Sequence, residues 1–187
     1  MNRVLIFIMV FTRITYCGHA QSSSEIDNLG IDSTNRFMFS KTDIAIFNGD
    51  IDEYKKYANN YYYAGEPDSL FHNMILYSYF MAERYGNAYA AYNCFYLLGG
   101  LSNIPQDSSL TFFLLHLLEI GASVDTSCAD MAEIGCAYYL SNWYNGREYI
   151  EPDPIKQHYY KEKANAMARC RKRRLDKTIN KYENTQY

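Results

Sequence analysis

Three short segments of this 187-residue chain share one pattern. Each has an aromatic residue, two further residues, a glycine and, some positions later, an aspartate: "YYAGEPD" (62–68), "YLLGGLSNIPQD" (96–107) and "WYNGREYIEPD" (143–153). The glycines Gly65, Gly99 and Gly146 can each end a helix, because positive φ costs little without a Cβ. The aspartate can then cap the next helix by accepting backbone N–H bonds. The pattern predicts a unit of helix, glycine turn and capped helix, which must stack on neighbours to bury its apolar face.

The rest of the chain supports an all-α fold. Apolar residues recur at helical spacing, turns fall at Gly, Pro and Asn, and strand signals are weak. Ser127 followed by Asp130 predicts a capping pair at the start of the sixth helix. We expect seven helices, at residues 36–47, 52–64, 68–84, 88–98, 108–120, 127–145 and 154–178.

The N-terminus has the pattern of a signal peptide. A short charged start and eight apolar residues, Val4 to Phe11, precede Gly18-His19-Ala20 and a polar stretch. We expect cleavage after Ala20, with lipid attachment at Cys17 and a first helix of the fold as alternatives. The predicted organisation is a signal peptide (1–20), a polar linker (21–33), a helical domain (34–178) and a frayed tail (179–187). No later segment has the roughly 18 uninterrupted apolar residues of a transmembrane helix.

Charge is unevenly distributed along the chain. The formal net charge is −3, but residues 151–187 carry +5 and residues 1–150 carry −8. This asymmetry fits either an acidic partner for the C-terminal segment or a solvated helix with basic residues near its C-terminus. The basic run "RCRKRR" (169–174) has no interleaved aromatic residues, and exported proteins rarely meet nucleic acid. We therefore expect no nucleic-acid partner.

Two segments and the helix after the second resemble the Sel-one-like repeat (SLR) family, a relative of the tetratricopeptide repeat. In "AYAAYNCFYLLG" (88–99) and "GCAYYLSNWYNG" (135–146), small residues, aromatics and glycines fall in the family's register. The matching positions in the second helix are Asp153, Lys156, Tyr160, Lys163 and Ala164. The resemblance covers residues 50 to 178 and implies a right-handed α-solenoid of about three antiparallel helix pairs. It also implies structural roles for repeat positions Gly65, Gly99, Trp143, Gly146 and Asp153.

The cysteines allow two interpretations. Secreted cysteine-rich members of the family join a cysteine at the end of one repeat to another eight residues later, and "CADMAEIGC" resembles that arrangement. The resemblance therefore implies a disulfide between Cys128 and Cys136. A helix beginning at residue 127 would instead hold both cysteines about 12 Å apart along its axis, too far for a bridge. Cys94 occupies a core-facing position, where we expect a packed thiol.

No local motif indicates catalysis. His72, His116 and His158 lie in separate predicted helices, and none is four residues from another His or Cys. The sequence also lacks the motifs of α/β-hydrolases, P-loop nucleotide-binding proteins and zinc proteases. We expect no catalytic residue, no metal and no cofactor.

Tyrosine is the compositional outlier, at 20 residues, and it suits both half-buried helix seams and binding surfaces. The resemblance implies a concave face made by the first helix of each pair. The candidate partner-binding residues on that face, some of which we expect in the core, are Tyr57, Tyr61, Tyr89, Tyr138 and Tyr139.

The expected function is non-catalytic protein binding, as an envelope adaptor exported to the bacterial periplasm. The protein partner is then an envelope protein. One alternative is an immunity protein that neutralises a secreted antibacterial toxin, since small exported SLR proteins recur in that role. Another alternative is an envelope hydrolase. The sequence has no Ser-x-x-Lys motif, which argues against that chemistry.

Overall fold

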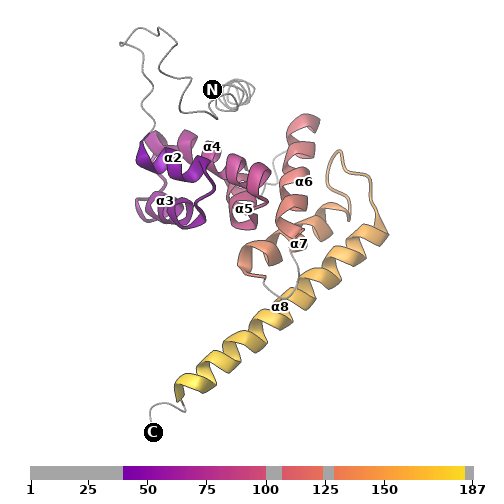
Figure 1. The fold of residues 1–187 in the computed structure, drawn as a ribbon. Coiled ribbons are helices and arrows are strands. Elements are labelled where there is room, and N and C mark those ends of the chain that lie inside the picture. Colours follow the sequence, from indigo (N-terminus) through magenta and orange to yellow (C-terminus); the bar gives the residue numbers. More distant parts are fainter. Residues whose placement is uncertain (1–39, 100–106, 124–128, 184–187) are drawn as a thin grey trace. The chain divides into compact units, whose positions relative to one another are not determined.

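The computed structural model describes residues 40–99, 107–123 and 129–183 (Figure 1). Within these ranges the chain forms seven helices and no strand, which confirms the all-α prediction. They are α2 (Lys41–Phe47), α3 (Ile51–Tyr63), α4 (Asp68–Tyr85), α5 (Ala88–Leu97), α6 (Ser108–Ala122), α7 (Met131–Trp143) and α8 (Pro154–Glu183). The chain divides into two units, Met1–Asp43 and Ile44–Tyr187, and the helices that follow α2 all belong to the second. The predicted signal peptide, Cys17 and the linker lie outside the described residues.

The glycine turns are as predicted. Gly65, Gly99 and Gly146 have φ angles of 79°, 83° and 123° and follow α3, α5 and α7 respectively. Trp143, the last residue of α7, is buried, and its ring centroid lies 5.6 Å from that of Phe95 in α5. The turn therefore places a large aromatic residue between two helices directly before the chain reverses.

Two of the three aspartates in the shared pattern cap a helix. Asp153 accepts hydrogen bonds from the backbone N–H groups of Ile155 (3.1 Å) and Lys156 (3.0 Å) at the start of α8. Asp107 caps α6 in the same way. Asp68 does not, because Pro67 occupies the cap position and Asp68 is already the first residue of α4. There the carboxylate can still interact favourably with the helix dipole.

Three predicted boundaries are wrong. The first predicted helix begins at Lys41 rather than at residue 36, because Ser40 is its cap and exchanges backbone–side-chain hydrogen bonds with Asp43. The sixth predicted helix begins at Met131 rather than at residue 127, because Asp130 is the cap and its N–H donates to Glu133 Oε2 at 2.8 Å. A Glu three residues after the cap satisfies the free backbone N–H better than the Ser127–Asp130 pair would. The last helix continues to Glu183, so residues 179–183 are helical rather than part of a tail. No Gly or Pro follows Pro154 to end it.

The new start of α7 also bears on the cysteines. Cys136 lies in α7, which begins at Met131 after the non-helical residues 129 and 130, so the alternative that placed both cysteines in one helix is wrong. Cys128 lies outside the described residues, and its pairing with Cys136 therefore stays a prediction.

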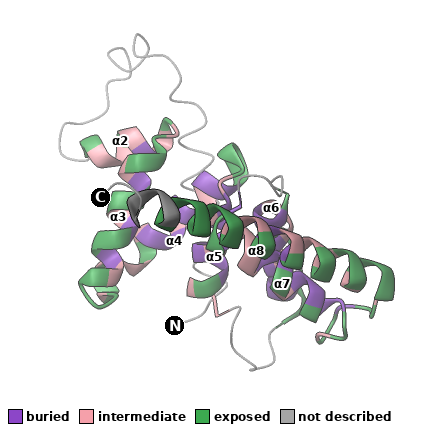
Figure 2. Ribbon diagram, turned by 90° about the horizontal axis from the view of Figure 1, so that it is seen from below, coloured by how far each residue is buried: buried purple, intermediate pink, exposed green. Residues whose placement is uncertain are grey.

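From α3 onward, each helix packs against the next one in the chain. In addition α4 contacts α6, and α5 contacts α7. The core lies mainly along α4 to α7, whereas α8 adds only Ala164 and Met167 to the buried positions of the described chain (Figure 2). Residues 172–179 of α8 are all exposed.

Two glycines allow α7 to approach its neighbours closely. A Cβ on Gly121 of α6 would overlap the Sγ atom of Cys136, and a Cβ on Gly135 would lie 2.9 Å from the Tyr92 ring of α5. Real side chains do not tolerate such contacts without moving. The resemblance gave Gly135 and Cys136 a place in the repeat, and the structure adds a packing reason for this pair of small residues.

We expect Gly121→Ala to destabilise the fold. In an uncrowded helix this change would stabilise by about 1 kcal/mol, because alanine has the higher helix propensity. Here the overlap with Cys136 should reverse the sign and cost about 1–3 kcal/mol. Urea denaturation measures the change, and adding Cys136→Ala should restore part of the loss. Phe112→Ala, at an exposed position of the same helix, is the control. An unchanged or higher midpoint in Gly121→Ala would show that the crossing is looser than described.

Candidate functional site

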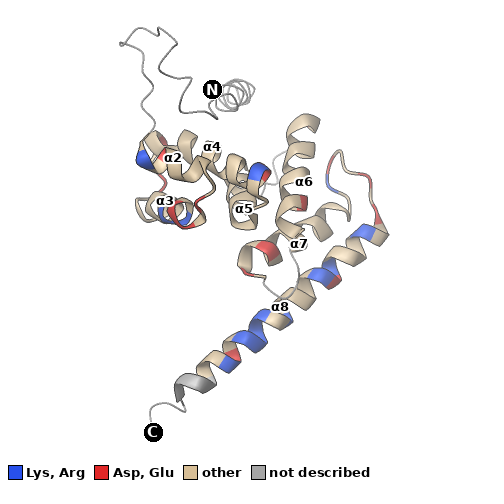
Figure 3. Cartoon of the chain, in the orientation of Figure 1, with Lys and Arg blue, Asp and Glu red and all other residues tan. Residues whose placement is uncertain are grey.

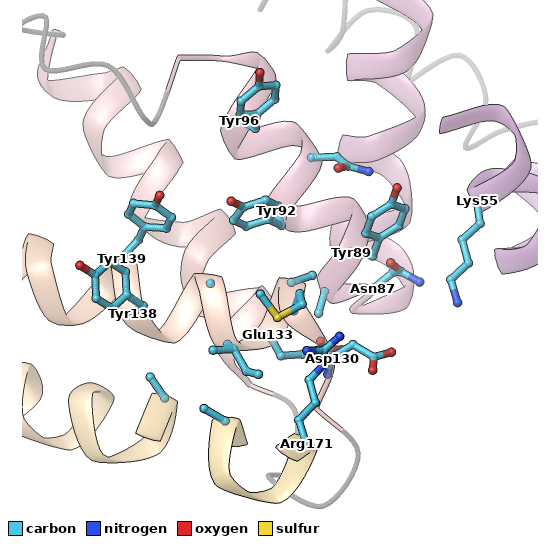
Figure 4. A pocket seen from close by; sticks show the side chains of 18 of the residues that line it. Lys55, Asn87, Tyr89, Tyr92, Tyr96, Asp130, Glu133, Tyr138, Tyr139 and Arg171 are labelled. Carbon is cyan, nitrogen blue, oxygen red and sulfur yellow. The ribbon is translucent and has the colours of Figure 1, made fainter. Parts of the chain in front are cut away.

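A groove of about 1050 Å³ runs between α3, α5, α7 and α8 (Figure 4). Tyrosines from three of these helices line it: Tyr62 from α3, Tyr89, Tyr92 and Tyr96 from α5, and Tyr138 and Tyr139 from α7. The fourth helix, α8, contributes mainly small residues, Ala164 and Ala168, together with Arg171 at one end. The groove thus has aromatic walls and a boundary of short side chains.

The α5 wall follows from the helical repeat. Tyr89, Tyr92 and Tyr96 are spaced by three and four residues, so they lie on one side of the helix. Figure 4 shows the three rings following one another along α5. The residues between them, including Cys94 and Phe95, are buried in the core. The helix therefore has one face for packing and one for the groove.

The α7 wall combines a packed ring and an exposed one. Tyr139 packs against the core, with its ring centroid 5.4 Å from Phe95 and 6.4 Å from Tyr92. Tyr138 packs edge-on against Tyr139 and remains 56% exposed. Gly135, one turn earlier, leaves the space that the Tyr92 ring occupies. Tyr92 and Tyr139 are thus held in position, while Tyr138 stays accessible.

A chain of hydrogen bonds runs from the core to the groove. The hydroxyls of Tyr54 and Ser78 are 2.8 Å apart, and Asn93 Nδ2 donates to Tyr54 Oη at 3.0 Å. Tyr62 Oη in turn donates to Asn93 Oδ1 at 3.2 Å. Asn93 is only 4% exposed, so its amide is fixed by partners from α3. The network sets the register of α3 against α5 and hence the position of Tyr62 in the groove.

Burial raises the pKa of several of these phenols. It raises the pKa of Tyr54 and of Tyr62 far above the ordinary value for tyrosine. Burial also raises the pKa of Tyr92, and the neighbouring Tyr139 adds to the shift. A tyrosine hydroxyl is already neutral at physiological pH, and burial makes its ionisation still less favourable.

Charged residues occur at the margins of the groove. Lys55 and Glu66 come from α3 and the following turn, whereas Asp130, Glu133 and Arg171 lie close together at another part of the margin (Figure 4). Glu133 is engaged with the Asp130 backbone at the start of α7. The tyrosines between these margins are uncharged, so an aromatic and hydroxyl-bearing surface forms the middle of the groove.

The basic run near the C-terminus does not act as one patch. Lys and Arg are concentrated along α8 (Figure 3). Arg171 lines the groove, whereas Arg174 donates to the Ala129 carbonyl at 2.9 Å and lies 3.5 Å from Asp130 Oδ1. Arg174 thereby attaches α8 to the residues that precede α7. Part of the charge asymmetry thus has a structural use.

The structure brings together three of the five tyrosines that the sequence singled out. Tyr89, Tyr138 and Tyr139 line the groove. Tyr61 is 1% exposed and belongs to the core, as expected for some of the five, so it is no longer a candidate for partner contact. Tyr57 does not line the groove and packs edge-on against Tyr77, with centroids 4.9 Å apart. Sequence reasoning missed three lining tyrosines, Tyr62, Tyr92 and Tyr96.

The reactive groups of the described chain are not assembled into a centre. Cys94 and Cys136 are fully buried, and burial raises the pKa of both thiols, so they stay protonated. His116 is 3.0 Å from Glu83 in an exposed pair outside the groove. Within the described ranges, no group of three His, Cys, Asp or Glu residues could hold a metal ion. No helix within those ranges is long and apolar enough to cross a membrane.

Comparisons with protein families, with curated proteins and with solved structures found no match for this chain. The function is therefore inferred from the groove itself.

We expect Asn93→Ala to destabilise the fold by about 1–3 kcal/mol, because it removes one partner of the buried Tyr54 hydroxyl and the partner of the part-buried Tyr62 hydroxyl. Chemical denaturation measures the change. Asn59→Ala is the matched control, since Asn59 also lines the groove but is exposed. Equal midpoints for the two variants would mean that the buried network contributes nothing to stability.

Proposed function

We propose that this protein is a non-catalytic, protein-binding helical-repeat protein whose groove receives its partner. The observation that carries this proposal is the set of six tyrosines from three helices along one open groove. Tyrosine is enriched at protein interfaces because its ring supplies a large contact area at a small entropic cost and its hydroxyl can form a hydrogen bond. The uncharged middle and charged margins match the usual division of an interface into core and rim.

The repeat architecture is part of the proposal. The glycine turns, the caps at Asp107 and Asp153, and the contacts between helices one and two apart support a right-handed SLR-like solenoid of antiparallel pairs. In such a fold a groove arises from the first helix of each pair, as α3, α5 and α7 would be here.

We also propose that the protein is exported to the bacterial periplasm and binds an envelope protein there. The support is the sequence pattern around Gly18-His19-Ala20. N-terminal sequencing of the mature protein is expected to give Gln21 as its first residue. A mature chain starting at Met1 would contradict export by cleavage, and a lipid-modified Cys17 would place the protein on a membrane surface.

The groove can be tested by photo-crosslinking in living cells. A benzophenone amino acid at position 138, where the side chain is 56% exposed, should crosslink a protein partner. The same amino acid at position 63, which is 90% exposed and outside the groove, should not.

With the captured partner, Tyr138→Ala should weaken binding by about 2 kcal/mol, as expected for an interface anchor, and Tyr63→Ala should leave the affinity unchanged. Isothermal titration calorimetry measures both. Charge reversal at the exposed Lys172 and Arg173 should mainly change the association rate and its salt dependence. If the charge reversal abolishes partner binding while Tyr138→Ala still binds with full affinity, the binding site is on α8 rather than in the groove.

A further inference from the structure

We propose that the groove recognises a proline-rich segment of its partner in the polyproline II conformation. This inference rests on the proposed binding function and names the chemistry of the ligand. Grooves lined with aromatic side chains are the usual receptors for such segments, because proline rings stack on aromatic faces and the chain loses little entropy on binding. Three features of the groove favour this ligand over other peptides.

The first feature is the spacing of the rings on α5. Tyr89 and Tyr96 both line the groove and are seven residues apart. At 1.5 Å per residue they are about 10.5 Å apart along the helix axis. One turn of polyproline II covers three residues and about 9.3 Å. A segment lying along α5 can therefore present equivalent proline rings, one turn apart, to these two tyrosines, with Tyr92 between them.

The second feature is the supply of hydrogen-bond donors. Proline has no backbone N–H, so a proline-rich segment offers mainly carbonyl acceptors. No hydrogen bond joins the hydroxyls of Tyr89, Tyr96 or Tyr138 to another of the described residues. Asn93, by contrast, has both ends of its amide engaged within the fold. The accessible polar groups in the middle of the groove are thus phenol hydroxyls, which can donate to the carbonyls of the ligand.

The third feature is charge. The lining residues with a formal charge are two cations, Lys55 and Arg171, and three carboxylates, Glu66, Asp130 and Glu133. This balance gives no advantage to an acidic segment. The groove presents hydroxyl groups beside its rings, together with apolar side chains such as Met131 and Ile134. The hydroxyls can donate to the free backbone carbonyls of an extended ligand, whereas most carbonyls of an amphipathic helix are already engaged within the helix. An uncharged, acceptor-rich, extended ligand fits better than either.

Synthetic peptides test the proposal on the full-length chain. The probe is an acetylated and amidated decaproline, with a Gly/Ser decapeptide, an acidic Glu-rich peptide and an amphipathic helical peptide as comparisons. Affinities are measured by isothermal titration calorimetry. Decaproline is expected to bind at least tenfold more tightly than the Gly/Ser peptide and the other comparison peptides.

Substitutions then locate the binding site. Tyr89→Ala and Tyr96→Ala should each weaken decaproline binding about tenfold, because each removes an aromatic anchor. Tyr89→Phe and Tyr96→Phe should weaken it about threefold, because the ring remains and only one hydrogen bond is lost. Tyr63→Ala is the control outside the groove. Chemical-shift changes of the tyrosine rings in the unmodified protein give the same information without any substitution.

The outcomes separate this inference from the proposed function. If decaproline binds no better than the Gly/Ser peptide, the proline inference is overturned. If the amphipathic or acidic peptide binds instead and depends on Tyr89 and Tyr96, the groove remains a binding site for a different ligand. If decaproline binds but neither the Tyr variants nor the tyrosine shifts respond, the ligand lies elsewhere and the inference also fails. If position 138 captures no partner in cells, the proposed function fails independently.

Discussion

The close approach of α7 to α5 and α6 depends on the absence of a side chain at Gly121 and Gly135. Gly121 lets the Cys136 thiol lie against α6, and Gly135 lets the Tyr92 ring lie against α7. A larger residue at either position would push α7 outward. The groove would then widen between α5 and α7, because the Tyr92 and Tyr139 rings that line it contact each other across this crossing. The site thus depends on the packing distance between helices as much as on its own side chains.

The second constraint is polar. Asn93 is buried with both amide groups engaged, and it links α5 to two tyrosines of α3. An apolar contact would allow α3 to slide, but hydrogen bonds with defined distances fix one register. Because Tyr62 belongs to this network and also lines the groove, the register of α3 against α5 fixes the position of Tyr62 in the groove. The tyrosines therefore have two different uses in this protein, as core residues with internal partners and as surface residues with accessible hydroxyls.

Much of the helical order could be predicted from the sequence because its breaks are marked locally. Gly65, Gly99 and Gly146, together with Asp107 and Asp153, gave helix boundaries close to those observed. The start of α7 was misplaced because Ser127 and Asp130 are both good caps, and only the Glu133 side chain decides between them. It was harder to predict from the sequence which tyrosines face the core and which face the groove. Tyr92 and Tyr96 share a stripe with Tyr89 and could have been found by helical spacing.

Other parts of the site have no local signature. Tyr61 and Tyr62 are adjacent in the sequence, yet one is core and the other lines the groove. The difference depends on how α3 is rotated against α4 and α5, which is a tertiary property. The entry of Arg171 into the groove likewise depends on where α8 crosses α7, and composition alone indicated only a basic helix.

The attachment of α8 has a consequence for the order in which the exported protein folds. Ala164, Ala168 and Arg171 form one boundary of the groove, and Arg174 fixes α8 to the carbonyl of Ala129. During the proposed export, α3 to α7 would cross the membrane before α8 and could then pack in sequence, since each contacts the next. The groove would be completed only when this last helix has crossed. A chain still in transit would therefore have the tyrosines in place without the surface that encloses them, and recognition would begin only after the arrival of α8.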